Sequence, residues 1–226
     1  MYTSAGNTVS TTRTVGEILL GCLYYPLPMS LSKFLLFLCI SLSLLGCAST
    51  KVETTGVVPT RSLCQSNGES LSALVLWSPQ WRPDQKEPVR REAAALRGIQ
   101  NFFVNSRCVN NVDIRRLPNE HSIEAPSDDQ LLRLATATAP APDIVYFITV
   151  RELGPKLLIG IPAIIEGGTE VVIDVRVLNV RTSESMASVR TRWQNGGKFV
   201  IKGVETLDQD MSAALRTTLS PAPVSP

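Results

Sequence analysis

The chain has 226 residues but only one histidine, His121. A zinc site usually takes several histidine or cysteine ligands at close spacing, so no metal site is expected. A nucleophilic triad needs a base beside an activated serine or cysteine, and the chain has no Gly-x-Ser-x-Gly motif to present one. Asn119, Glu120 and Ser122 surround His121 in a polar stretch. We therefore interpret His121 as a surface residue, and expect no catalytic residue and no cofactor.

Neither sign of charge is in large excess, since 22 basic and 20 acidic residues give a formal net charge of only +2. Arg90-Arg91 and Arg115-Arg116 are isolated pairs, typical of solvated faces, and no basic stripe is present. No nucleic-acid partner is expected. Gly167-Gly168 and Gly196-Gly197 lack the longer phosphate-loop pattern and its lysine, so they are predicted to supply turns.

The sequence lacks an apolar run long enough to cross a membrane, which takes about 20 residues. The run Phe34 to Leu45 has 12. It follows Met29-Ser30-Leu31-Ser32-Lys33 and precedes Gly46, an order of basic stretch, apolar core and small residue that is typical of a secretory signal. Leu44-Leu45-Gly46-Cys47 closes the run and resembles the lipobox of bacterial lipoproteins.

This resemblance implies that the Cys47 thiol takes a diacylglycerol and that the chain is cut before it. Alanine at position 48, rather than aspartate, implies an outer-membrane anchor with the domain facing the periplasm. A second Leu-Leu-Gly-Cys, at Leu19 to Cys22, has no apolar core ahead of it, so we expect Met29 to be the start. The alternative is that Phe34 to Leu45 is buried in the domain and Cys47 is a buried thiol.

These features predict five segments along the chain. Residues 1–28 are a non-native extension, 29–46 the signal peptide, 47–62 a lipidated tether without strand or helix period, 63–219 one α/β domain, and 220–226 a disordered tail. Cys64 and Cys108 are the cysteines that remain in the domain. An even pair in an oxidising compartment predicts one disulfide, with two unpaired thiols as the alternative.

Hydrophobic periodicity predicts that the domain alternates strands and helices. Strands are expected at residues 71–77, 109–117, 143–150, 169–179 and 186–194. Helices are expected from Pro88, from the capping box Ser127 to Gln130, and from Thr206 to Leu219. The order β-α-β-α-β-β-β-α predicts a mixed sheet of about five to six strands with three packing helices. In the first helix, one buried stripe is expected at Val89, Ala93, Leu96, Ile99 and Phe103.

The segment Pro155 to Ile165 is strongly apolar but is broken by Pro155, Gly160 and Pro162. One interpretation is an edge strand or flap over the sheet. The other is an exposed patch that docks a partner protein or a membrane surface. Its docking candidates are Ile161, Ile164 and Ile165.

An exported lipoprotein with this order of elements resembles three envelope domains: those of the peptidoglycan-synthase activator lipoproteins, of the curli-secretion lipoproteins, and the N-terminal domain of the Tol-system β-propeller protein. The resemblance covers about Leu71 to Leu219 and matches no residue signature. It implies a non-enzymatic, membrane-anchored binding or assembly module with an envelope protein partner. An envelope hydrolase using His121 and a small-ligand sensor are the alternatives, and the sequence leaves the oligomeric state open.

Overall fold

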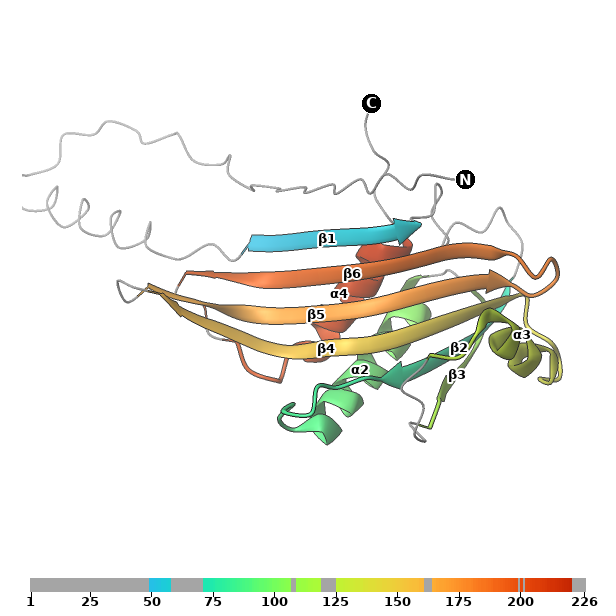
Figure 1. The fold of residues 1–226 in the computed structure, drawn as a ribbon, viewed down its shortest axis with the longest axis horizontal. Coiled ribbons are helices and arrows are strands. Elements are labelled where there is room, and N and C mark those ends of the chain that lie inside the picture. Colours follow the sequence, from blue (N-terminus) through green and yellow to red (C-terminus); the bar gives the residue numbers. More distant parts are fainter. Residues whose placement is uncertain are drawn as a thin grey trace, which may run out of the picture.

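The computed structural model describes residues 49–57, 71–106, 109–118, 125–160, 164–198, 200 and 202–220. Their elements are β1 (Ser49–Val57), β2 (Ser72–Pro79), α2 (Pro88–Ser106), β3 (Asn111–Arg116), α3 (Asp128–Thr136), β4 (Ile144–Gly160), β5 (Ile164–Asn179), β6 (Ser185–Lys198) and α4 (Leu207–Leu219). The six strands form one mixed sheet in the order β1-β6-β5-β4-β2-β3 (Figure 1). The predicted α/β class with three helices is thereby confirmed.

The sheet is parallel at one end and antiparallel at the other. Strand β2 pairs in parallel with both β3 and β4, and α2 and α3 make the crossovers between these strands. Strand β4 pairs antiparallel with β5, β5 pairs antiparallel with β6, and β6 pairs antiparallel with β1. The stretch Ile144 to Val150 has a partner on each side, as expected for the most apolar predicted strand.

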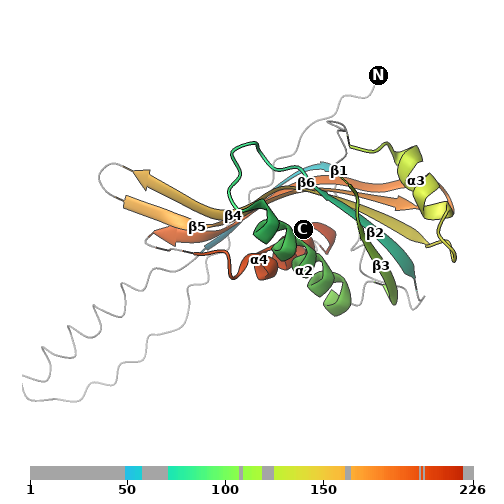
Figure 2. The same cartoon turned by 90° about the horizontal axis from the view of Figure 1, so that it is seen from below.

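Helices cover the two faces of the sheet unequally (Figure 2). Helices α2 and α4 pack on one face over the larger core, which contains Trp77, Phe103, Tyr146 and Trp193. They approach closely, because a Cβ on Gly98 would lie 2.5 Å from the Cβ of Met211. Helix α3 packs on the opposite face over a smaller core, which contains Leu74, Leu76, Leu131 and Phe147. No helix in the described ranges is long and apolar enough to cross a membrane.

Local signals placed the helices well. The Ser127 hydroxyl accepts from the backbone N–H of Gln130, whose side chain accepts from the backbone N–H of Ser127, so the predicted capping box is present. Helix α2 begins at Pro88 as predicted. The helix predicted from Thr206 to Leu219 is present as α4, and its apolar residues at every fourth position are all buried: Leu207, Met211, Leu215 and Leu219.

The stripe predicted for α2 was wrong in part. Val89 is 80% exposed and Ala93 is also exposed, while Ile99 and Phe103 are buried as predicted. The buried face instead continues through the small and aromatic residues Ala94, Ala95, Gly98 and Phe102. Small residues are needed there because α2 lies directly against α4.

The segment predicted as a tether without strand structure contains β1. Strand β1 pairs with β6 over its whole length, from Ser49 opposite Gly196 to Val57 opposite Ser188. Only Val52 and Thr54 are half-buried, so the apolar alternation that marks a strand is weak here. The partner strand lies far along the chain, and local periodicity cannot reveal such a pairing.

The glycine pairs do not supply turns, and Gly196-Gly197 does not interrupt the sheet. Gly167 and Gly168 of β5 lie opposite Gly197 and Gly196 of β6. A Cβ on Gly196 would lie 2.1 Å from the backbone oxygen of Gly167, so the two strands approach too closely for side chains. Glycine is required here by close backbone approach.

The two described ends of the broken apolar segment Pro155 to Ile165 belong to strands. Residues 155–160 complete β4, and β5 begins at Ile164. Strand β2 pairs with β4 only as far as Val150. Beyond that point, this side of β4 has no strand beside it among the described residues, so the interpretation of an edge strand holds for the backbone.

Candidate functional site

Most site residues predicted from the sequence lie outside the described residues. This is true of Cys47, Cys64, Cys108, His121 and Ile161. The strands that follow Cys64 and Cys108 in the sequence are β2 and β3, which are neighbours in the sheet. The disulfide, the lipidation and the role of His121 stay predictions. Ile164 and Ile165 open β5.

The described residues instead show a charged surface, which we name the open face. It is the side of β1, β6, β5 and the second half of β4 that α2 and α4 do not cover. Strand alternation directs the intervening residues Val171, Ile173, Val175, Val189 and Trp193 into the core. The open face carries seven basic and four acidic side chains: Lys51, Arg151, Lys156, Arg176, Arg190, Arg192, Lys198, Glu53, Glu166, Glu170 and Asp174.

Asp174 on β5 lies between two arginines of the neighbouring strands. Its Oδ2 is 2.5 Å from Nε of Arg151, and its Oδ1 is 2.5 Å from Nε of Arg190. Burial alone would raise the pKa of Asp174, but the hydrogen bonds from Arg190 and Arg151 bring that pKa below its ordinary value. The same contact raises the pKa of Arg190. Three strands are thus joined by one ionised carboxylate.

Glu170 makes a second junction four residues along β5. Its Oε1 accepts hydrogen bonds from Nε of Arg192 and from Nε2 of Gln194, the latter at 2.7 Å, and Nζ of Lys156 is 3.7 Å away. Burial opposes ionisation, but the Gln194 and Arg192 hydrogen bonds leave the pKa of Glu170 lowered. The open face therefore holds its charges in fixed positions.

The opposite end of the sheet has a comparable junction at Asp143. Its Oδ2 accepts from the backbone N–H and the hydroxyl of Ser72, both at 2.9 Å, and Oδ1 accepts from Arg181. The Ser72 backbone hydrogen bond, followed by that of Arg181, lowers the pKa of Asp143. This carboxylate ties the start of β4 to the start of β2.

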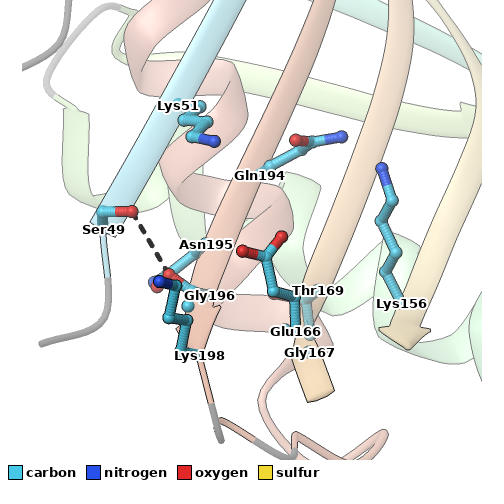
Figure 3. A pocket seen from close by; sticks show the side chains of 12 residues that line it. Ser49, Lys51, Lys156, Glu166, Gly167, Thr169, Gln194, Asn195, Gly196 and Lys198 are labelled. Carbon is cyan, nitrogen blue, oxygen red and sulfur yellow. Dashed lines mark hydrogen bonds between the residues drawn. The ribbon is translucent and has the colours of Figure 1, made fainter. Parts of the chain in front are cut away.

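At the end of the open face where β1 begins, the sheet carries a shallow hollow of about 370 Å³. Its floor is the glycine crossing of β5 and β6, and the Ser49 hydroxyl donates to the backbone oxygen of Gly196 at 3.3 Å. Figure 3 shows three lysines around it, with Glu166 among them: Lys51, Lys156 and Lys198. Sequence reasoning missed this hollow, because its rim comes from four strands whose register is set by the fold.

The arrangement supports binding better than bond-making chemistry. Asp174 and Glu170 are engaged by arginine, lysine and amide groups, which lower the pKa of both carboxyl groups. No group of three metal-ligating side chains gathers among the residues that the structure describes. Fixed charges of both signs on a rigid sheet can recognise a polar surface of complementary pattern.

We predict that Asp174→Asn lowers the free energy of unfolding at pH 7 by about 1–2 kcal/mol, because two half-exposed arginines lose their counter-charge. The folded pKa of Asp174 is depressed, so its contribution is complete above the unfolded pKa of about 4 and is lost as pH falls through the folded value. The difference between wild type and variant should shrink below about pH 4. Urea unfolding between pH 3 and 7 measures it.

Asp84→Asn is the matched control, since Asp84 is 79% exposed and lies 3.8 Å from Arg82. We expect it to change the free energy of unfolding by less than about 0.5 kcal/mol at every pH. An equal effect of the two substitutions would contradict a specific role for the Asp174 junction.

No protein-family model matches the chain, and no curated protein matches it in sequence. Several solved bacterial structures are similar at low identity. The PelC dodecamer from Paraburkholderia phytofirmans is 12% identical, with a TM-score of 0.40, and the match covers 76% of this chain and 99% of that one. Lipoprotein GNA1162 from Neisseria meningitidis is 16% identical, with a TM-score of 0.39 and coverage of 65% and 96%.

Protein XCC0632 from Xanthomonas campestris, assigned to the family model DUF330, is 13% identical, with a TM-score of 0.35 and coverage of 72% of this chain and 89% of that one.

Proposed function

We propose that the chain is a bacterial lipoprotein, anchored in the outer membrane through Cys47, whose domain faces the periplasm. There it serves as a non-enzymatic binding or assembly module of the cell envelope. The order of Lys33, the apolar run Phe34 to Leu45, Gly46 and Cys47 supports the anchor. Several acyl chains on one residue give firm anchoring, at about 0.8 kcal/mol per buried methylene.

The structural observation that carries this proposal is the place where the sheet begins. Strand β1 starts at Ser49, only two residues after Cys47. Two residues of extended chain span at most about 7 Å. A lipid on Cys47 would therefore hold the sheet itself close to the membrane, rather than through a tether of some 15 residues.

The open face supports the binding part of the proposal. Seven basic and four acidic side chains leave an excess of three positive charges over four strands. Salt bridges fix most of these side chains, so little conformational entropy is lost when a partner binds. A partner with a polar surface of net negative charge fits this pattern.

The anchor is tested by Cys47→Ser in the full chain, expressed in a bacterium with its own lipoprotein pathway. The wild type should fractionate with the membrane, resist release by high salt and carry a lipid mass on Cys47. The variant should lose the lipid mass and accumulate as uncleaved precursor or in the soluble fraction. Continued membrane retention of the fully processed variant would contradict the lipobox.

Cys22→Ser is the matched control, because the second Leu-Leu-Gly-Cys ends at Cys22. We expect it to leave the lipid mass and the fractionation unchanged.

A further inference from the structure

Strand β1 forms one edge of the sheet along its whole length. It pairs with β6 on one side, and among the described residues no strand lies on its other side (Figure 1). An edge strand presents a row of backbone N–H and C=O groups that can pair with a further strand, and natural edges are commonly protected by proline, bulges or charge. The nine residues Ser49–Val57 contain no proline, and their pairing with β6 runs without a shift in register.

The two charged residues of β1 have opposite signs and lie two positions apart. Lys51 and Glu53 lie on the open face, and Val52 between them packs against the larger core on the opposite face. Within the described part of the chain, Lys51 has no ion pair. Glu53 has a single one, 4.0 Å from Arg192, and its side chain is 63% exposed. Neither charge is therefore well matched inside one chain.

This pattern is complementary to itself when two copies of β1 lie antiparallel with Val52 opposite Val52. Directly opposite residues of an antiparallel pair lie on the same face of the sheet. Lys51 of each copy then lies opposite Glu53 of the other, and Thr50 lies opposite Thr54. Moving the symmetry axis by one residue, to Lys51 or to Glu53, places two like charges opposite each other, which is destabilising. The charges thus favour the register centred on Val52.

From this complementarity we propose that β1 pairs with β1 of a second copy of the chain, antiparallel over Ser49 to Thr55, about a two-fold axis at Val52. The paired range ends before Gly56, whose φ of +112° departs from strand geometry. Seven residues of each strand give about six to eight backbone hydrogen bonds between the copies. The inference goes beyond the proposed function, and it does not require a lipid on Cys47.

The pairing joins two six-stranded sheets into one continuous sheet. Because opposite residues share a face, the open faces of the two copies lie on the same side and form one doubled surface with an excess of positive charge. The two Ser49 residues lie six positions apart along the strands, about 20 Å at 3.3 Å per residue. Both chains can therefore be anchored in the same membrane.

Thiol crosslinking of the full chain in whole cells tests the inference. The substitution Val52→Cys places two cysteines directly opposite each other, with Cβ atoms about 5 Å apart. A short bis-methanethiosulfonate reagent should join them into a covalent dimer. Non-reducing electrophoresis and immunoblotting should show this dimer at least about fivefold above the wild-type chain, because the separation matches directly opposite residues. The wild type also measures any crosslinking through Cys64 and Cys108.

Val57→Cys is the matched control. Val57 is 67% exposed and so is open to the reagent, but the two copies of this residue lie about 33 Å apart in the proposed register. We expect no dimer above the wild-type level. If Val52→Cys fails to unfold cooperatively in urea, chains carrying Thr50→Cys and Thr54→Cys with different tags replace it. The mixed pair should then crosslink much more than two Thr50→Cys chains.

Charge exchange tests the register itself. Adding Lys51→Glu to Val52→Cys should lower the dimer fraction at least about fivefold, since like charges then lie opposite each other at two symmetric places. Glu53→Lys should act in the same way, and the two exchanges together should restore the dimer. Lys198→Glu makes the same change of charge on the open face outside β1, and it should leave the dimer fraction unchanged.

Four results would overturn the inference. They are absence of a dimer in a folded Val52→Cys chain, equal crosslinking at positions 52 and 57, failure of the double exchange to restore the dimer, and capture of a different protein at position 52 in place of a second copy. Mass spectrometry of the same samples reports the lipid on Cys47 separately. A failure of β1 pairing is therefore distinguished from a failure of the proposed anchor.

Discussion

Replacing Arg91 by alanine is expected to lower the free energy of unfolding by about 3 kcal/mol, toward the lower end of the cost of breaking a buried ion pair. The Arg91 side chain is only 9% exposed and lies between α2 and β4. Its guanidinium donates to the backbone oxygens of Lys86 at 2.7 Å and Leu153 at 2.5 Å, and to Oε1 of Glu152 at 3.3 Å. Arg82 would remain beside Glu152 and moderate the loss. Urea unfolding followed by circular dichroism measures it.

Arg90→Ala is the natural control for this prediction. Arg90 is 68% exposed and pairs with Glu87 at 3.0 Å on the helix surface, so its loss should cost less than about 0.5 kcal/mol. Gly154→Ala tests the same contact from the side of β4. The added Cβ would lie 1.6 Å from Nη1 of Arg91 and must displace the guanidinium. Its cost should be smaller in an Arg91→Ala background, since the two residues are in contact. Full additivity would contradict the contact.

Phe103→Ala should be the most destabilising single substitution in α2, at about 3–5 kcal/mol, because a large cavity would open in the core. The Phe103 ring is 1% exposed and packs edge-to-face on Phe102 at 4.9 Å and on Tyr146 of β4 at 5.0 Å. It therefore joins the helix to the central strand. The midpoint of urea unfolding should fall, with little change in the slope.

Val89→Ala distinguishes the structure from the simple helical stripe. The sequence spacing places Val89 and Phe103 on one buried face, whereas in the structure Val89 is 80% exposed. Its truncation should change the free energy of unfolding by less than about 0.5 kcal/mol. A loss comparable with that of Phe103→Ala would mean that the face predicted from spacing is the packed one.

The features that the sequence predicted correctly depend on neighbouring residues. The capping hydrogen bonds at Ser127, the start of α2 at Pro88 and the alternation of β5 and β6 each involve residues a few positions apart. The buried position of Arg91 does not depend on neighbouring residues. Its partner Glu152 lies 61 residues away, next to an irregularity in the register of β4 between Val150 and Glu152. An arginine pair that is typical of a solvated face therefore contains one buried member.

The open face shows the same limit. The alternation of Asp174, Arg190 and Arg192 with apolar residues indicated two strands, and that was correct. Which arginine pairs with which carboxylate depends on the register of β5 with β6 and on the neighbouring strand β4. The periodicity of a single strand does not reveal its register with another strand. A prediction of the hollow would also have required the pairing of β1 with β6. The weak apolar alternation of β1 did not indicate a strand.

The pairing of β1 with β6 sets an order on the maturation of the chain. Ser49 and Gly196 are 147 residues apart, and a ribosome adding about 5–20 residues per second needs roughly 7–30 s to make the intervening chain. During that interval the first strand has no neighbour, and the sheet cannot close around it. An enzyme that acts on the chain during this interval therefore meets a first strand that is not yet paired with β6.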